Sequence, residues 1–446
     1  MRNIAIIGSG QAGLLAAHGL INAGYKVTLY SDRTADQWLN ESRPTGTAAR
    51  FDISLAYERE LGLSHWEKEA PKGEGVHLTF SPTKDNRLLT LAGRLEKYFL
   101  AIDLRLQSHR WMNDFAAKGG KIEIENVTVL RLDEIAGAHE LTIVATGRAD
   151  LANLFERDAA RSVYDKAQRN LTMIITTGGK MGFAGVPFLP VKFNFFAPFG
   201  EAFYVPYFHK DHGPTWNMLI EAKPGSPLDR FGDCKSGEQA VAIYKQVLKE
   251  VIPWDYDWAK DMELADPYGW LVGRVAPTVR KPVGRLPSGR IVTPLGDTSM
   301  ALDPIGGQGA NNGNKMTRNL VESIIARKDL PFDAQWMTDT FERFYNRFGG
   351  YLHLQQHSML LIAQYGSDGR ARGSTGQQRI ADAFIENFND ANVLTQAFLH
   401  IHKAHVAIRE KTGLSWPLAV ARGAIGVAKG QLRQKLGREP GHPTVS

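Results

Sequence analysis

The sequence predicts an α/β protein in which a parallel-sheet domain is interrupted by a mostly β domain and followed by a helical region. Three observations predict this fold. A short apolar run at residues 4–7 leads into glycines and a helix, residues 170–222 alternate as strands do, and the pattern from Phe332 onward is helical. We expect the first domain at residues 1–165 and 281–330, the β-sheet domain at 166–280, and the helical region at 331–446.

The first thirty residues contain a strand, a glycine motif and a helix in succession. Residues 3–15 read NIAIIGSGQAGLL, with Gly8, Gly10 and Gly13 in GxGxxG spacing. A helical stretch at 14–23 and a strand, KVTLY, follow, which is the β-α-β context that the motif requires. Gly8 permits a tight turn, Gly10 lets the backbone approach a pyrophosphate, and Gly13 allows helix and strand to pack closely. This pattern indicates a Rossmann-type dinucleotide site, and a strand–helix turn without a ligand is the alternative.

The end of the second strand departs from the usual dinucleotide pattern. An acidic residue about twenty residues after the glycines commonly binds the ribose hydroxyls. Here the strand ends Tyr30-Ser31-Asp32-Arg33. Ser31 or Asp32 could bind ribose, and Arg33 could reach a phosphate.

A second glycine cluster lies near residue 300. Residues 291–314 read IVTPLGDTSMALDPIGGQGANNGN, so a strand at 291–295 runs into Gly296-Asp297 and a helix begins near Asn311. The Asp297 carboxylate is placed to accept from ribose or ribitol hydroxyls. The loop from Pro304 would bring bare backbone and a helix N-terminus to an anionic or electron-rich ring. An ordinary glycine-rich turn is the alternative.

A third piece lies between these two clusters. The segment KIEIENVTVL at 121–130 alternates and is expected to be a strand, and TIVATGRAD at 142–150 starts as another. A strand that ends in the small residues Ala145-Thr146-Gly147 could pack directly against a cofactor.

Taken together, these motifs resemble the flavoprotein monooxygenases of the para-hydroxybenzoate hydroxylase fold. Within that group the sequence is similar to the styrene/indole monooxygenases, the FAD-dependent epoxidase components of two-component systems. Thr146 narrows the resemblance, because single-component aromatic hydroxylases usually have an Asp-Gly motif there that is tied to pyridine-nucleotide use. The segments that carry the resemblance are GSGQAGL, VTLYSDR, RPTGTAAR, DLRL at 103–106, ATG at 145–147, GD…LDPIGGQGANNG at 296–313 and ENFND at 386–390.

The resemblance implies FAD as the cofactor and a set of residues that hold it. Arg43 would lie near the flavin or its phosphates, and Arg105 near the ribityl-phosphate region, with a surface salt bridge as the alternative for each. Asp297 would bind a ribitol hydroxyl, and the loop after Pro304 would lie beside the isoalloxazine. The candidate cofactor residues are Gly8, Gly10, Gln11, Ala12, Gly13, Ser31, Asp32, Arg33, Arg43, Arg105, Ala145, Thr146, Gly147, Gly296, Asp297, Pro304, Gly307, Gln308, Gly309, Ala310 and Asn311.

The segment after Arg43 lines the substrate pocket in the resembled family. Styrene-type enzymes would have Asn, Val and His, and indole-type enzymes Ser, Gln and Met, at the positions held here by Gly46, Ala48 and Arg50. This chain fits neither pattern. The small residues make room, and Arg50 could meet a carboxylate or face solvent. The aromatic-rich strands add Phe193, Phe195 and Phe203 as pocket candidates, while most neighbouring aromatic residues are expected in the core.

The activity implied by the resemblance is oxygen transfer. A separate NADH:flavin oxidoreductase would supply reduced FAD, O₂ would form a C4a-hydroperoxyflavin, and this would epoxidise or oxygenate a styrene- or indole-like substrate or a sulfide. Neither a catalytic side chain nor a metal is expected. The alternatives are a single-component NAD(P)H-dependent hydroxylase and a flavin-binding partner or sensor without turnover. A halogenase is disfavoured, because the WxWxIP signature is missing.

Composition sets looser bounds. The net charge of +6 over 446 residues fits an anionic cofactor as well as it fits nucleic acid, so it does not distinguish between them. A single cysteine, Cys234, excludes an intramolecular disulfide. We expect a cytoplasmic protein with no transmembrane segment and no nucleic-acid partner. A monomer and a homodimer both fit the sequence. The histidines at 353 and 357 and at 400–405 suggest packed or solvated side chains rather than a metal site. The last forty residues indicate a basic amphipathic helix that could dock on a reductase, an anionic membrane or the protein itself; its cations are Arg422, Lys429, Arg433, Lys435 and Arg438.

Overall fold

The computed structural model of the chain consists of two compact units, each built from three stretches of sequence. The first comprises residues 1–66, 102–167 and 275–352, and the second 67–101, 168–274 and 353–446. The expected domain boundaries had put 67–101 with the first unit. The structure describes residues 2–44, 46, 49–84, 86–147, 149–351, 353, 378–391 and 401–436.

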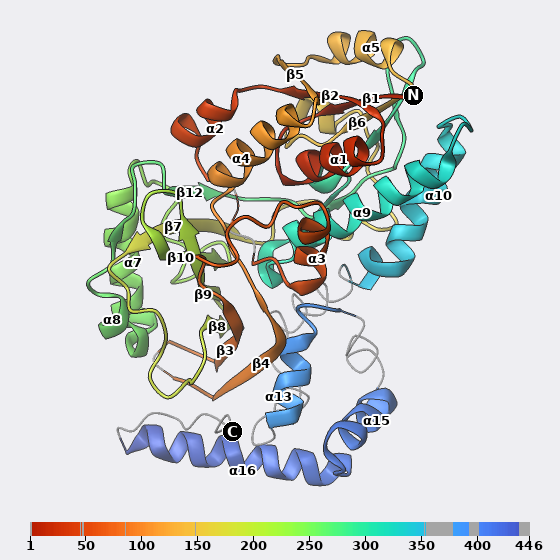
Figure 1. The fold of residues 1–446 in the computed structure, drawn as a ribbon. Coiled ribbons are helices and arrows are strands. Elements are labelled where there is room, and N and C mark those ends of the chain that lie inside the picture. The colour runs from red at the N-terminus through yellow and green to blue at the C-terminus, as the bar shows by residue number, and fades with distance from the viewer. Residues whose placement is uncertain are drawn as a thin grey trace. The chain divides into compact units, whose positions relative to one another are not determined.

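A six-stranded sheet forms the centre of the first unit (Figure 1). The strand order is β14-β15-β6-β1-β2-β5, and all neighbours are parallel except β14 and β15. The strands are β1 (Asn3–Ile7), β2 (Lys26–Ser31), β5 (Lys121–Ile124), β6 (Leu141–Val144), β14 (Gly284–Arg285) and β15 (Ile291–Pro294), and a separate pair consists of β13 (Thr278–Val279) and β16 (Met300–Ala301).

Alternation along β1 explains why helices cover both faces of this sheet. Ile4 and Ile6 pack into a core with α1, α4, α9 and α10, whereas Ala5 and Ile7 pack into a second core with α5. The helices are α1 (Gln11–Asn22), α2 (Ala35–Glu41), α3 (Asp52–Glu60), α4 (Leu104–Ala117), α5 (Val129–Ala138), α6 (Ala149–Ala152), α9 (Gly309–Arg327) and α10 (Ala334–Phe344), with shorter turns at Gly296–Thr298, Pro304–Gly306 and Tyr345–Gly349.

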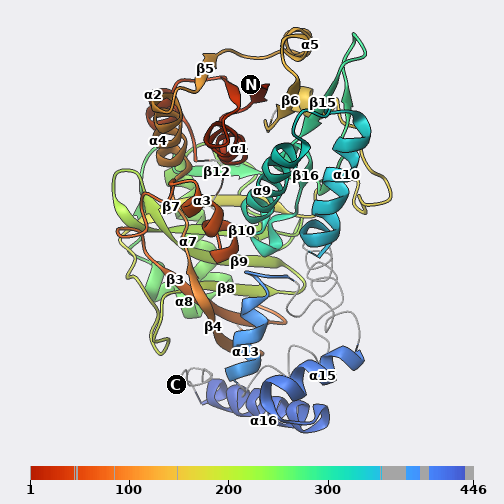
Figure 2. The ribbon, with the colours of Figure 1, turned by 45° about the vertical axis from the view of Figure 1, so that its right-hand side comes forward.

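The second unit is built on an eight-stranded sheet, in which β8, β9 and β10 run side by side (Figure 2). Its order is β11-β7-β10-β9-β8-β3-β4, with β12 also paired to β7; only β3 and β8 are parallel. The strands are β3 (Gly73–Ser81), β4 (Leu89–Phe99), β7 (Asn170–Thr177), β8 (Pro190–Phe196), β9 (Gly200–His209), β10 (Gly213–Ala222), β11 (Glu263–Leu264) and β12 (Trp270–Gly273).

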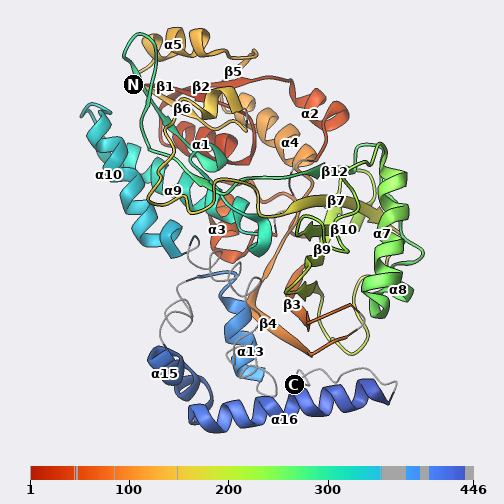
Figure 3. The same ribbon diagram turned by 180° about the vertical axis from the view of Figure 1, so that it is seen from behind.

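Helices cover one face of this second sheet (Figure 3). Trp216, Met218 and Ile220 of β10 pack against α7 and α8, in a core that also holds Tyr244 and Val247. The helices of this unit are α7 (Gly237–Val251), α8 (Pro253–Ala259), α13 (Gln378–Glu386), α15 (Ile401–Thr412) and α16 (Trp416–Lys435). None of the helices in the described part of the chain has the length and apolar character that crossing a bilayer requires.

Most predicted elements are confirmed, and one is wrong. The helix expected at 14–23 is α1, and the basic helix expected near the C-terminus is α16. The strand expected at 121–130 ends at Ile124, and residues 129–138 form α5. The cause is a local cap: the Thr128 hydroxyl accepts a hydrogen bond from the backbone N–H of Arg131 and starts the helix. Parts of the helical stretches expected at 333–364 and 376–408 lie outside the described residues.

Candidate functional site

The first glycine motif and the Ala-Thr-Gly strand end lie against each other. Gly8 has a φ of +114°, and a Cβ there would collide with the Ala145 carbonyl. A Cβ on Gly13 would collide with the carbonyl oxygen of Gly8. These two contacts explain why glycine is required at both positions: Gly8 turns the chain beside β6, and Gly13 lets α1 pack on the turn.

The second glycine cluster, almost 300 residues after the first, lies against the first glycine motif. Gly296 follows β15 with a φ of +64°, and a Cβ on it would lie 3.1 Å from the Ala12 methyl. The Thr298 hydroxyl donates to the Thr146 carbonyl at 2.6 Å. The three glycine-bearing segments, near residues 8, 147 and 296, therefore converge at the carboxyl ends of β1, β6 and β15, where α/β sheets bind ligands.

The backbone is open beside three of these glycines. A Cβ built on Gly10, Gly147 or Gly307 would meet no atom within 4 Å. Gly10 is the N-cap residue of α1 and Gln308 that of α9, and neither helix has a side-chain cap at its first turn. Two helix N-termini therefore offer uncapped backbone N–H groups beside bare backbone, as a pyrophosphate and an electron-rich ring require.

Asp297 follows Gly296 in the turn after β15. Its side chain is accessible to solvent, yet surrounding protein desolvates the carboxylate and raises its pKa, an effect that the nearby Arg280 guanidinium partly offsets. Arg280 also donates to the Asp297 and Thr298 carbonyls at 3.3 Å. An accessible but poorly solvated carboxylate is suited to accept hydrogen bonds from ligand hydroxyls.

The end of β2 holds a serine pair in place of the usual acidic residue. The buried Ser31 hydroxyl lies 2.7 Å from that of Ser9, and the Trp38 indole donates to Ser9 at 2.8 Å. Asp32 forms an exposed ion pair with Arg33 at 2.6 Å. The Arg33 guanidinium lies 4.7 Å from the Trp38 ring centre and donates to Ser42. Of the three candidates here, Asp32 and Arg33 are accessible to a ligand, and the Ser31 hydroxyl is buried against Ser9.

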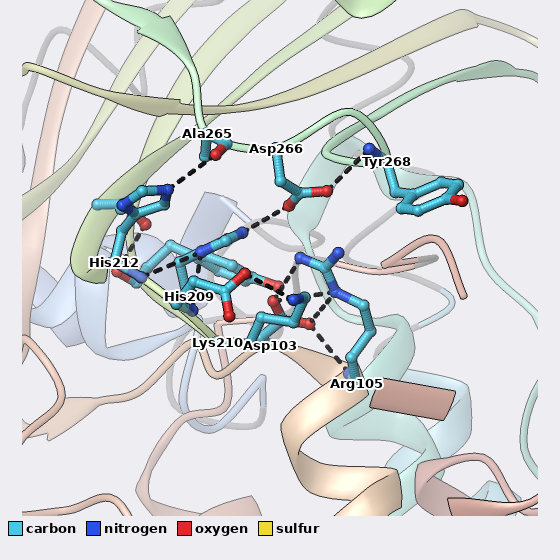
Figure 4. Close-up of polar contacts among 11 residues, drawn as sticks. Asp103, Arg105, His209, Lys210, His212, Ala265, Asp266 and Tyr268 are labelled. Carbon is cyan, nitrogen blue, oxygen red and sulfur yellow. Dashed lines mark hydrogen bonds and ion pairs between the residues drawn. The ribbon is translucent and has the colours of Figure 1, made fainter. Parts of the chain in front are cut away.

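The two predicted arginines lie in different environments. Arg43 is exposed in the segment after α2. Arg105 is fully buried, and its guanidinium is held by the equally buried Asp103, with 2.7 Å between Nη2 and Oδ2 (Figure 4). Asp103 also accepts from the backbone N–H of Arg105 and so caps α4. Arg105 is thus a member of a buried ion pair at the start of α4, not of a surface salt bridge.

Asn311 and Gln11, both candidate cofactor residues, make contacts within the protein. The Asn311 amide donates to the Ala49 carbonyl at 2.8 Å and accepts from the Phe51 N–H at 2.9 Å. The Gln11 amide contacts Asn314 and donates to the Ala310 carbonyl at 3.4 Å. The Gln308 amide donates to the carbonyl of Gly306, which lies in the same loop. These side chains fix the start of α9 against α1 and against the segment before α3.

Arg50 does not face solvent, one of its two expected environments. It is 1% exposed, and its Nε lies 2.6 Å from Glu58, which also accepts from Asn314 at 2.9 Å. The carboxylate that Arg50 contacts therefore belongs to the protein itself and not to a ligand. Gly46 is half-buried, with the Leu104 side chain 3.3 Å from where a Cβ would lie. Ala48 lies outside the described residues.

The predicted pocket phenylalanines lie on one face of the second unit's sheet. Phe193 of β8 and Phe203 of β9 are paired in register, and their rings stack 5.3 Å apart at 11°. Phe195 lies 6.4 Å from Phe193 on the same face. All three are about 5% exposed. The opposite face, with Asn194 and Tyr204, binds the buried carboxylate of Asp255.

A buried histidine fixes the end of β9 in the second unit. His209 Nδ1 accepts from the backbone N–H of Asp211 at 3.1 Å, so Nε2 carries the proton and donates to Asp266 at 2.6 Å (Figure 4). Asp266 in turn accepts from the Tyr268 N–H. This cluster orders the turns after β9 and β11. Across the residues that the structure describes, no group of three or more acidic, histidine or cysteine side chains could hold a metal ion.

Sequence reasoning missed Ser9, Trp38 and Arg280. Ser9 lies inside the glycine motif, so the motif itself could have indicated it. Trp38 is 29 residues from Ser9, and Arg280 is 17 from Asp297, and no local pattern connects either pair.

The chain is similar to known proteins over much of its length. Residues 147–257 match the family model described as the styrene monooxygenase A putative substrate binding domain. Styrene monooxygenase StyA of Pseudomonas fluorescens is 26% identical over 344 residues, in a match that covers 74% of this chain and 80% of that protein. Styrene monooxygenase StyA of a Pseudomonas species matches to the same extent.

Solved structures show the same fold. Flavin-dependent brominase Bmp2 superposes with a TM-score of 0.59 at 14% identity, covering 90% of this chain and 99% of that one. The flavin-dependent halogenase CmlS gives a TM-score of 0.62 at 13% identity, covering 97% and 78%. The p-nitrophenol 4-monooxygenase PnpA from Pseudomonas putida DLL-E4 gives 0.58 at 15% identity, covering 90% and 99%. At these identities the likeness is one of fold.

The sequence relatives identify the chain as an FAD-dependent monooxygenase. The solved structures show that it has the para-hydroxybenzoate hydroxylase-like fold. Among such enzymes, this protein is a relative of the styrene monooxygenases.

Proposed function

We propose that this protein is the oxygenase component of a two-component system, which takes reduced FAD from a separate NADH:flavin oxidoreductase. The observation that carries the proposal is its relatedness to styrene monooxygenases over 74% of the chain. Thr146 supports it, because it precedes Gly147 where single-component hydroxylases usually have an aspartate. Bound reduced FAD supplies two electrons to O₂: one oxygen atom enters the substrate and the other leaves as water.

The chain's own residues bind and orient the cofactor in this proposal. Backbone at Gly10 and the N-terminus of α1 hold the pyrophosphate, on the turn that Gly8 and Gly13 allow, and Asp297 accepts from a ribitol hydroxyl. The N-terminus of α9, with its first N–H groups uncapped, stabilises negative charge on the flavin ring.

The proposed substrate is a small apolar or aromatic molecule, an alkene, indole or sulfide. The stacked face of Phe193, Phe195 and Phe203 lies in the segment matched to a putative substrate binding domain, and aromatic faces bind apolar rings. The residues at 46 and 50 match neither the styrene-type nor the indole-type pattern. Because Arg50 is paired with Glu58, a substrate carboxylate is not required.

Product formation under controlled electron supply tests the proposal. Purified protein receives photoreduced FAD and O₂, or NADH with a flavin reductase, together with styrene, indole or a methyl aryl sulfide. We expect oxygenated product in both cases, and no NADH oxidation when the reductase is left out. Rapid NADH oxidation by the protein alone would establish a single-component hydroxylase. Flavin binding without any product would establish a flavin-binding protein that lacks turnover.

A further inference from the structure

Helix α16 presents an apolar stripe on its exposed side. Leu418, Ile425, Leu432 and Leu436 are 45%, 55%, 59% and 65% exposed. With 3.6 residues per turn, these four side chains lie within an arc of about 40° along one side of the helix. Scattered exposed leucines are ordinary, but four in line over five turns form a continuous apolar surface.

Cations flank this stripe on both sides. Arg422 and Lys429 are exposed within about 40° of the Leu418 direction, and Lys435 is exposed on the other flank. No Asp or Glu occurs between Trp416 and Leu436, so these cations have no acidic partner along their own helix. Long basic side chains beside an apolar stripe can lay their stems on it and raise their charges above it.

Within the second unit, the helix is fixed to its neighbours. It contacts β4 and α15, and α15 leads directly into it (Figure 3). The Trp416 ring at its start lies 4.8 Å from the His405 ring of α15. The apolar and cationic stripe is therefore carried by a docked helix rather than a detached one.

From these observations we propose that the exposed side of α16 docks in the plane of an anionic lipid surface. An interfacial helix has this combination of an apolar stripe and flanking Lys or Arg. A second copy of the chain is disfavoured, because a two-fold contact would bring both copies of Arg422, Lys429 and Lys435 into one interface without any acid from this helix. A protein groove is disfavoured, because the stripe offers no Trp or Tyr anchor. A lipid-docked monooxygenase meets its apolar substrate where that substrate concentrates, although the docking itself does not depend on the substrate.

Vesicle flotation of the full-length, FAD-loaded protein tests this docking. We expect at least tenfold stronger partitioning into phosphatidylcholine vesicles containing about 30 mol% phosphatidylglycerol than into pure phosphatidylcholine. Raising salt from about 0.1 M to about 0.5 M should release the wild-type protein, a result that needs no variant.

Two variants separate charge from apolar contact. One combines Arg422→Gln, Lys429→Gln and Lys435→Gln, and the other Leu418→Asn, Ile425→Asn and Leu432→Asn. Each should lose binding at least tenfold while retaining its far-UV circular dichroism and FAD affinity. A matched control removes three exposed, acid-paired cations from other surfaces by Arg110→Gln, Lys121→Gln and Lys260→Gln, and should bind as wild type.

Three results would overturn the proposal. The first is equal binding to neutral and anionic vesicles, or binding to neither. The second is a charge variant that binds like the wild type. The third is a wild-type dimer in solution that the Leu418, Ile425 and Leu432 substitutions dissociate, because a second copy would then cover the stripe.

Discussion

At the scale of single residues, Gly10 and Gly13 separate ligand binding from folding. A methyl on Gly10 enters open space, and its φ of −76° suits any residue, whereas a methyl on Gly13 meets the Gly8 carbonyl. We expect Gly10→Ala to leave apoprotein stability within about 0.5 kcal/mol and to weaken FAD binding at least tenfold. Gly13→Ala should cost about 1–3 kcal/mol of unfolding free energy, because backbone must move.

Urea unfolding of the apoproteins and FAD titration by flavin fluorescence measure both effects. Gly232→Ala is the control, since a methyl there also meets no atom within 4 Å but lies in the second unit. Wild-type FAD affinity in Gly10→Ala would show that the pyrophosphate does not approach this residue.

Residue roles were predictable where a motif dictates backbone. GxGxxG spacing identified Gly8 and Gly13 because their constraint is local. Side-chain partners were less predictable. Arg50 was expected to meet a carboxylate or to face solvent, and its Nε lies 2.6 Å from Glu58, in the second turn of α3. Removing either member would leave the buried charge of the other without its ion-pair partner, which gives Arg50 a structural role in the first unit.

At the scale of elements, α13 protects the edge of a sheet. β4 is the last strand of its sheet, and its N–H groups at Arg94 and Glu96 donate to Asp382 at 2.8 Å and Glu386 at 2.9 Å. The two acids are four residues apart, so one side of α13 serves alternate residues of the strand. Unpaired edge strands invite association with other chains.

Asp382→Ala combined with Glu386→Ala should uncover this edge. Losing two hydrogen bonds worth about 1 kcal/mol each should speed amide exchange in residues 89–99 by up to roughly thirtyfold, and light scattering should rise. Asp382→Asn with Glu386→Gln keeps an acceptor oxygen at each site and is the matched control. Unchanged exchange in the alanine variant would mean that packing of α13 against Gly93, not these bonds, holds the edge.

Elements also show why prediction succeeds or fails. α1 and β7 were predicted well because their periodicity spans the whole element. The strand predicted from the alternation of KIEIENVTVL at 121–130 runs into the first two residues of α5, because the cap at Thr128, which starts the helix, is a single interaction that the alternation does not indicate. The α13–β4 contact joins residues 288 apart, and a single sequence contains no signal for that pairing.

At the scale of the whole molecule, each unit draws on three separate stretches of chain. The three glycine-bearing segments near residues 8, 147 and 296 come from all three stretches of the first unit, so their arrangement depends on the fold of that whole unit. His18, at the contact of α1 with α4, links that fold to pH. It is fully buried, its Nε2 donates to the Trp111 carbonyl at 2.8 Å, and Lys118 lies 3.3 Å from Nδ1. Burial lowers its pKa from 6.5 to about 4.

A histidine whose folded pKa is lowered binds protons more readily when unfolded. The unfolding free energy should therefore be constant above pH 7 and fall as pH drops from about 6.5 towards 4, by up to about 3 kcal/mol. Asp297 acts in the opposite direction, because its raised pKa favours the folded state at lower pH. Comparing variants isolates His18: His18→Gln should flatten the fall between pH 7 and 5 in urea unfolding, and His402→Gln, on the exposed side of α15, should not. Parallel curves for wild type and His18→Gln would show that proton uptake elsewhere controls acid unfolding.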